Sequence, residues 1–458
     1  MGTIGRRSVL SASLGAAAAA TLPRPHIAKA AATTATVWWT QGFIREEDVA
    51  FRGLVAEYEK ASGNKIDCSI MPFMALGQKA VAALTSGDVP DIVSYDNAPL
   101  APQNAWDDKL IDVNDVVETQ KSQFSQTALL ASHFYNNVRR RRDFYLVPYK
   151  AVTVPFHVWR SLVQQAGHRI EDAPATWDAH WDFFKQVHNS LRAKGNRKVY
   201  GLGLQITTVG PGDGNILFEQ FLIANGGKDI VTRDGTLHTS DPNVREAAIK
   251  SVAYMTTAYK EGYVPQEALS WNDADDNNAF HAKRIVMDFD GTISTELAVI
   301  DNRSEYDDIV TQGVPLGNDN QPMPALSFVL GGFIPKGARN ITVAKDFLQY
   351  LIQPHVMNEY LKNGLGRTVP AIPALLRQDP FWLDPSDPHR SAYVRELLGP
   401  TVTPYIAFNP GWAQVEAEQL WGQAHADVIK NDLSPAAAVD KAFQRAEAIF
   451  ARYPIVQS

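Results

Sequence analysis

The sequence predicts an α/β protein in which mostly parallel sheets are covered by helices and distributed over two or three lobes. Segments with strand character at 36–39, 65–70 and 91–95 alternate with two segments whose apolar residues recur every three or four positions. This alternation predicts a parallel sheet, because parallel neighbours are joined by a crossover that is usually helical. The chain has 458 residues, which is longer than a single hydrophobic core usually supports, so more than one lobe is expected.

Residues 1–30 have the pattern of an export signal. Arg6 and Arg7 precede a weakly apolar, alanine-rich stretch, and residues 28–30 offer small side chains for cleavage near Ala30. The arginine pair favours the twin-arginine pathway, although an ordinary secretory signal with a chance arginine pair would have the same pattern. Both interpretations place the mature protein outside the cytoplasm, and we expect it in the periplasm.

The remainder has the composition of an acidic globular protein. It carries 39 basic and 50 acidic side chains, a formal net charge of −11, which argues against nucleic acid as a partner. The arginine run 139–142 is therefore interpreted as a solvated hairpin turn. Outside the N-terminus no apolar run reaches the 18 residues that indicate a membrane helix. Cys68 is the single cysteine and is expected on a buried strand face, so neither an internal disulfide nor a lipid anchor near the cleavage region is expected.

The middle and the end of the chain continue the mixture of strands and helices. Two β-rich runs at 144–148 and 152–156 flank Tyr149 and Lys150. Asp241 is expected to cap a helix, and Ser434 is expected to cap the last one. The other predicted elements are helices at 177–193, 216–224, 242–260, 342–351 and 355–362, and strands at 285–289 and 327–334.

Five stretches carry a resemblance to a known family, and they occur in its expected order. They are AEYEKASGNKI at 56–66, AALTSGDVPDIV at 82–93, YLVPY at 145–149, LGGFIPKG at 330–337 and GRTVPA at 366–371. With them the mature chain resembles the family 1 extracellular solute-binding proteins, the maltose-binding-protein-like subunits of ABC importers. The resemblance covers essentially the whole mature chain.

The resemblance implies a two-lobed periplasmic-binding-protein fold of type II, with a ligand cleft between the lobes. We expect lobe 1 to comprise residues 31–148 and about 296–350, and lobe 2 residues 149–295 and about 351–458. The implied function is capture of a sugar, oligosaccharide or polyol by hinge closure and its delivery to an ABC permease in the inner membrane. A monomer without enzymatic activity, cofactor or metal is expected.

Candidate ligand contacts follow from the position of loops at the carboxyl ends of strands, where ligands bind in open parallel sheets. Aromatic rings suit the apolar faces of sugars, and polar groups suit their hydroxyls. Lys150 and Arg367 would meet a charged group if the ligand were anionic, or would each form a structural ion pair. The candidates are Trp39, Gln41, Phe43, Tyr95, Asp96, Asn97, Tyr149, Lys150, Asp213, Asn215, Trp271, Asp290, Thr292, Gly331, Gly332, Arg367 and Trp412.

An extracytoplasmic hydrolase is the alternative. The stretch DFDGT at 288–292 matches the DxDGT box of haloacid-dehalogenase-like phosphatases, in which Asp288 would be the nucleophile and Asp290 the general acid. That family begins its core with the box, whereas here it lies late in the chain. A glycosidase would need two facing carboxylates, and no pair is marked. Asp273 begins a calcium-like pattern that lacks its glycine and its final glutamate, so capping of a helix at 275–282 is expected instead.

Overall fold

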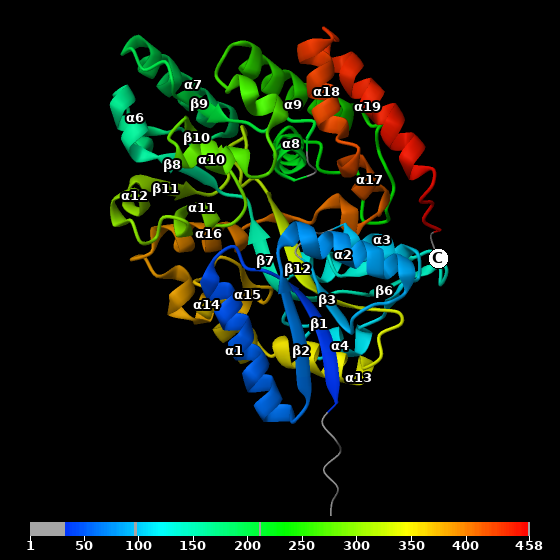
Figure 1. The fold of residues 1–458 in the computed structure, drawn as a ribbon. Helices are drawn as coiled ribbons and strands as arrows, with labels where there is room; N and C mark the ends of the chain where they lie inside the picture. Colours follow the sequence, from blue (N-terminus) through cyan, green and yellow to red (C-terminus); the bar gives the residue numbers. More distant parts are fainter. Residues whose placement is uncertain (1–32, 96–98, 210–211, 457–458) are drawn as a thin grey trace, which may run out of the picture. The chain divides into compact units, whose positions relative to one another are not determined.

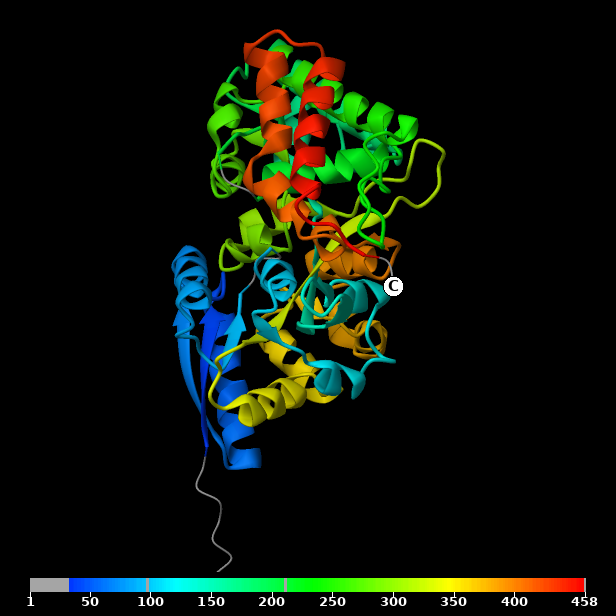
Figure 2. The same cartoon turned by 90° about the vertical axis from the view of Figure 1, so that its right-hand side faces the viewer.

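Two β-sheets form the cores of two lobes, and the strands β7 and β12 run from one lobe toward the other (Figures 1 and 2). The computed structural model describes residues 33–95, 99–209 and 212–456. The export signal expected at 1–30 lies outside the described residues. The first sheet has the order β13-β7-β12-β3-β1-β2, with β4 and β14 also paired to β12, and the second has the order β11-β8-β10-β9.

The strands of the first sheet are β1 (Thr34–Thr40), β2 (Lys65–Met71), β3 (Ile92–Ser94), β4 (Leu110–Ile111), β7 (Val147–Thr153), β12 (Ala325–Pro335), β13 (Val369–Pro370) and β14 (Thr401–Val402). Those of the second are β8 (Phe156–Trp159), β9 (Tyr200–Gly203), β10 (Ile285–Phe289) and β11 (Ile309–Gln312), and β5 (His133–Asn136) and β6 (Arg141–Phe144) form a separate hairpin.

The helices are α1 (Arg45–Ser62), α2 (Phe73–Ser86), α3 (Leu100–Trp106), α4 (Asn114–Glu118), α5 (Gln126–Leu130), α6 (Arg160–Ala166), α7 (Trp177–Ala193), α8 (Asp213–Ala224), α9 (Pro242–Lys260), α10 (Asp275–His281), α11 (Ser294–Leu297), α12 (Arg303–Asp308), α13 (Ile341–Leu351), α14 (Pro354–Asn363), α15 (Pro373–Gln378), α16 (Pro388–Leu397), α17 (Gly411–Ala417), α18 (Leu420–Lys430) and α19 (Pro435–Phe450).

The predicted parallel sheet is confirmed. Strand β1 pairs in parallel with both β2 and β3, and α1 and α2 supply the two crossovers. Local signals account for several element ends: Gly63 adopts φ 78° at the end of α1, and Asp241 accepts hydrogen bonds from the first backbone N–H groups of α9. Ser434 caps α19 in the same way, as predicted.

The carboxyl ends of the parallel strands in both lobes point to the same junction. Strand β12 runs antiparallel to β3, and because Gly332 pairs with Ser94, the residues of β12 before Gly332 continue past the end of β3. Strand β7 continues beside them and leads directly into β8. In the second sheet Phe289, the last residue of β10, pairs with Phe156, the first of β8. The ends of β9 and β10 therefore face the connection to the first lobe.

Within the described residues the chain passes between the sheets at three places, at 154–155, at 313–324 and after β14. The last passage brings α18 and α19 onto α9 in the second lobe, where Figure 2 shows them in red. The lobe boundaries differ from those expected. The boundary at 148/149 falls inside β7, residues 309–312 belong to the second sheet, and residues 354–363 form α14, which packs on α1 of the first lobe. Pairing between distant strands sets these boundaries, and local patterns do not encode it.

Candidate functional site

Trp39, Tyr149 and Lys150 form a buried aromatic and cationic group at the centre of the first lobe. The Trp39 ring stacks on Phe51 of α1 with centroids 3.8 Å apart, and on Tyr149 at 5.4 Å. The Lys150 ammonium lies 5.9 Å from the centroid of the Trp39 ring, and its side chain is only 3% exposed. Tyr149 and Lys150, expected between two β-rich runs, lie within β7. Because Trp39 is 2% exposed, it holds Tyr149 and Lys150 in place instead of offering an open platform.

A buried ion pair joins the first turn of α1 to the segment before β13. Arg367 Nε donates to Glu47 Oε2 at 2.7 Å, and the same oxygen accepts the backbone N–H of Phe43. Burial alone would raise the pKa of Glu47, but the charges of Arg367 and Lys150 hold it below its ordinary value. Glu47 therefore stays ionised and fixes the loop after β1, on which Phe43 remains 57% exposed and Gln41 is exposed.

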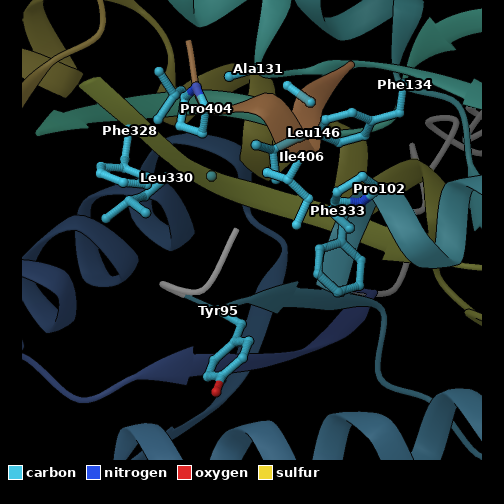
Figure 3. Close-up of a pocket in the computed structure, with 14 residues that line it drawn as sticks. Tyr95, Pro102, Ala131, Phe134, Leu146, Phe328, Leu330, Phe333, Pro404 and Ile406 are labelled. Carbon is cyan, nitrogen blue, oxygen red and sulfur yellow. The ribbon is translucent and has the colours of Figure 1, made fainter. Parts of the chain in front are cut away.

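Tyr95 follows β3 and borders a small cavity beside the crossing strand β12. Its ring stacks on Phe73 at 4.9 Å, and Figure 3 shows its hydroxyl pointing away from Phe328 and Leu330 of β12. Pro404 and Ile406 close the opposite side. The cavity of about 30 Å³ has room for a water molecule but not for a sugar ring. Asp96 and Asn97, expected next to Tyr95, lie outside the described residues.

Gly331 and Gly332 serve strand packing. Both are buried in β12, where the register with β7 shifts after Leu330. A Cβ atom at Gly331 would overlap the carbonyl oxygen of Val147, and one at Gly332 would lie 2.8 Å from a methyl group of Leu348. The two glycines therefore allow β12 to approach its neighbours closely, which the sequence could not distinguish from ligand contact.

Five carboxyl groups gather at the carboxyl end of the second sheet, and we call them the carboxyl cluster: Asp213, Asp273, Asp276, Asp288 and Asp290. Burial and the neighbouring carboxylates raise the pKa of Asp213 and Asp288 well above the ordinary value, and burial is the main reason why the pKa of Asp276 rises to about 8. Loss of solvation also raises the pKa of Asp273. Among the described residues none of the five forms an ion pair with Lys, Arg or His.

Two amide side chains hold the cluster together. Gln205 Nε2 donates to Asp276 Oδ2 at 2.7 Å and lies 3.4 Å from Asp213 Oδ2. Asn277 Nδ2 donates to Asp290 Oδ2 at 2.6 Å. Asp276 and Asp288 are at most 1% exposed, whereas Asp213 is half-buried and Asp273 is exposed. The cluster thus has a buried floor and an open mouth.

The DxDGT box does not form a phosphatase centre. Asp288, the would-be nucleophile, is completely buried in β10, where no substrate phosphate can reach its carboxyl group. The backbone N–H groups of Asp290 and Thr292 donate to the carbonyls of Pro155 and Thr153, so the box turns the chain at the connection between the lobes. No group of three or more His, Cys, Asp or Glu side chains in the described part of the chain is arranged to hold a metal ion.

The remaining candidates lie in the second lobe at different depths. Asn215 is 2% exposed and donates to the carbonyl of Glu416, which ties α8 to α17. Trp271 is 4% exposed, directly before the loop that carries Asp273. Trp412, expected near a loop mouth, is instead fully buried in α17, where its Nε1 donates to Glu219. It is a core residue because the C-terminal helices return to the second lobe.

Several residues of these groups were not predicted. Glu47, Gln205 and Asp276 join the candidates through contacts between distant parts of the chain, such as the pair between Glu47 and Arg367. Only Gln205, just beyond the end of β9, had a local signal in the sequence; Glu47 lies in α1 and Asp276 in α10. The helix expected at 275–282 is confirmed by α10, but its N-cap residue is Ala274, so the expected side-chain capping is absent at this helix. Cys68 is half-buried in β2 rather than fully buried. The arginine run at 139–142 lies at the predicted hairpin, although Arg142 turns inward and donates to the carbonyls of residues 133, 407 and 408.

Comparison with known proteins identifies a family and a shared fold. A family model described as bacterial extracellular solute-binding protein matches residues 53–390. No curated protein matches the chain by sequence. Of the described helices, none combines the length and the apolar character needed to cross a bilayer.

Three similar solved structures illustrate the fold. A solute-binding protein of an ABC transporter from Thermotoga lettingae TMO, bound with α-D-tagatose, is 19% identical with a TM-score of 0.71, covering 91% of this chain and all of that chain. A cyclic α-maltosyl-1,6-maltose binding protein from Arthrobacter globiformis is 20% identical with a TM-score of 0.73, covering 92% and 100%. A maltotriose-bound maltotriose binding protein from Thermus thermophilus is 18% identical with a TM-score of 0.65, covering 90% and 99%.

Proposed function

We propose that this chain, which belongs to the bacterial extracellular solute-binding protein family, captures a sugar, oligosaccharide or polyol for an ABC importer without transforming it. The convergence of both sheets on one junction carries the proposal. Strands β1, β2 and β3 of one lobe and β9 and β10 of the other end there, and predicted contacts from both lobes lie at those ends. Ligands bind at such ends because loops and helix N-termini meet there.

Capture requires the two lobes to close on the solute. The connections at 154–155, at 313–324 and after β14 form the hinge in this proposal, because a few residues outside regular elements can absorb the change in backbone angles. The charged candidates for solute contact in this proposal are Lys150 and Arg367 of the first lobe, of which Arg367 also donates to Glu47, and Asp213 and Asp290 of the second, of which Asp290 also accepts from Asn277. The similar structures include proteins that bind tagatose and maltotriose, which supports a carbohydrate-like solute.

The proposal includes the cellular setting. Export by the signal at 1–30 would leave a monomeric protein in the periplasm, and its closed form would deliver the solute to a permease in the inner membrane. Nucleic acid is not a partner in this proposal, because the mature chain carries a net negative charge. The burial of Asp288 supports binding without hydrolysis.

Thermal unfolding of the purified mature protein in the presence of sugars, polyols, amino acids and phosphates tests the proposal. We expect a stabilising carbohydrate or polyol, because a ligand that binds only the folded state raises the melting temperature. Mass spectrometry should recover that ligand unchanged. Lys150→Met should lose the stabilisation, and the control Lys198→Met, at an exposed position of the second lobe, should keep it. Failure of every carbohydrate and polyol, or turnover of the ligand, would contradict the proposal.

A further inference from the structure

The edge of the second sheet that lies opposite the junction carries a groove lined by basic side chains. It is formed by residues 196–200, where β9 begins, and residues 282–284, just before β10, and its volume is about 630 Å³. Its charged lining consists of Arg197 and Lys198 from the first segment and Lys283 and Arg284 from the second. None of the described residues that line it is acidic. We call the groove with these four side chains the basic groove.

The two segments of the basic groove are fixed by hydrogen bonds. The backbone N–H of Tyr200 donates to the carbonyl of Arg284 at 2.7 Å, which ties the segments together. Lys194 Nζ donates to the carbonyl of Gln165 in α6 at 3.0 Å, and Asn196 Nδ2 donates to the side chain of Gln165 at 3.3 Å. The groove is therefore present before any partner binds.

Structural contacts account for only two of the four cations. Lys283 and Arg284 each form one ion pair with a carboxylate that does not line the groove. Arg197 and Lys198 are exposed, and their side chains form no ion pair or hydrogen bond with a described residue. Their charged groups are therefore available to an anionic partner.

The charge of the basic groove is opposite to that of the whole protein. The chain without residues 1–30 carries a net charge of −11. The groove has four cations, and subtracting the paired carboxylates of Asp308 and Glu267 still leaves +2. Because charges more than about 10 Å apart are largely screened at moderate salt, the distant acidic residues do not cancel this local charge. The basic groove can therefore attract an anion although the protein is acidic.

An anionic membrane surface suits the basic groove better than an acidic protein does. Protein interfaces usually have an apolar core from which charged residues are depleted. The large apolar side chains that stay exposed in the described chain all lie elsewhere, and none lines the groove. Lipid phosphates need no apolar contact, because a guanidinium group binds them with paired hydrogen bonds and each Lys or Arg near an anionic bilayer adds attraction.

The basic groove is also separated from the region where the solute is expected. It lies at the amino ends of β9 and β10, whereas the junction between the lobes lies at their carboxyl ends. Strands of this length span roughly 15 Å at about 3.3 Å per residue. A partner in the groove therefore leaves the junction free to open and close.

We propose that the basic groove docks the protein on anionic phospholipids at a membrane surface, with Arg197 and Lys198 as the main contacts. This role goes beyond solute capture and does not depend on the identity of the solute. It would hold the exported protein close to a permease in the same membrane.

Co-sedimentation of the purified mature protein with lipid vesicles tests the docking surface. The vesicles consist of phosphatidylcholine with or without phosphatidylglycerol, and binding is measured at low and high salt without solute. We expect binding only to the vesicles that contain phosphatidylglycerol. High salt should abolish this binding, because it screens the attraction between the exposed cations and the headgroups.

Two double variants separate the basic groove from the general charge of the protein. Arg197→Gln with Lys198→Gln should weaken binding to phosphatidylglycerol vesicles by about 25-fold, about fivefold for each cation. The control, Arg52→Gln with Lys60→Gln, removes the same residue types from exposed positions of α1 in the first lobe and should change binding by less than about twofold. Both variants have the same net charge, and thermal melts check that each folds.

Three results would overturn the docking surface. They are the absence of vesicle binding at low salt, equal binding to neutral vesicles, and equal losses in the two double variants. Binding of soluble polyglutamate through Arg197 and Lys198, without binding of vesicles, would overturn it in favour of an acidic protein partner. Because these measurements contain no solute, each of these results leaves the proposed solute capture standing.

Discussion

The carboxyl group of Glu219 provides a sharp test of how the second lobe is stabilised. Glu219 lies on α8 with 1% exposure, accepts a 2.6 Å hydrogen bond from Trp412 Nε1, and shares a hydrogen bond with the side chain of Glu416. Burial raises the pKa of Glu219 from 4.5 to about 8. The folded protein therefore keeps a proton that the unfolded chain releases near pH 4.5. Glu219→Gln replaces this group with a neutral amide of the same shape.

The sign and size of the effect follow from proton linkage. Between pH 4.5 and 8 the folded state binds more protons than the unfolded state, so Glu219 makes the protein less stable as the pH rises. The free energy of unfolding falls by about 1.4 kcal/mol per pH unit where the folded state holds one more proton than the unfolded state. From pH 5 to pH 7.5 the free energy of unfolding of the wild type should fall by up to about 3 kcal/mol relative to that of Glu219→Gln. The fall is smaller if the proton is shared with Glu416, so that both carboxyl groups titrate together.

Urea unfolding of both proteins at pH 5 and pH 7.5, followed by circular dichroism, measures this difference. The control Glu246→Gln alters an exposed carboxylate on α9 whose pKa is lowered by Lys250, so it should not show the same gain at high pH. A stability difference between wild type and Glu219→Gln that is independent of pH, or that favours the wild type more at pH 7.5, would refute the reasoning.

Three further substitutions test other contacts. Arg367→Ala leaves the buried carboxylate of Glu47 without its main partner and should lower the free energy of unfolding by about 3 kcal/mol in urea titrations, with Arg367→Lys losing less. Trp412→Phe removes the donor to Glu219 and should cost about 1–3 kcal/mol in the same assay, yet ligand affinity by calorimetry should stay within about twofold because Trp412 is a core residue. Arg142→Met leaves three backbone carbonyls without their donor and should lower the melting temperature, whereas the control Arg140→Met at the hairpin turn should not.

Elements with strong local patterns could be predicted from the sequence to the residue. Helix α9 begins and ends where its apolar stripe and the Asp241 cap indicate, and β10 matches the predicted strand 285–289. The order of these elements was sufficient to predict an α/β protein with a parallel sheet, whereas the two-lobed binding-protein fold was implied by the family resemblance. The ends of these elements could be predicted because helix caps and apolar periodicity depend on residues within one or two turns of each other.

The candidate site could be predicted only at the level of loops. Trp39 and Asp290 lie at strand ends as expected, but whether a side chain faces solvent or the core depends on partners far along the chain. Arg367 meets Glu47 across 320 positions, and Trp412 is buried because a third passage between the lobes returns the C-terminal helices to α9. No local pattern specifies such pairings, so the burial of Trp412 and the gathering of the carboxyl cluster became visible only in three dimensions.

The distance between the lobes, with and without ligand, tests most directly the claim that this protein captures its solute by closing around it. Spin labels on Val81→Cys of α2 and Asn278→Cys of α10, both exposed positions in opposite lobes, would be placed in a Cys68→Ser background and measured by electron–electron double resonance. We expect saturating amounts of the stabilising carbohydrate to shift the distribution to shorter distances and to narrow it. An unchanged distribution at saturation would contradict capture by lobe closure.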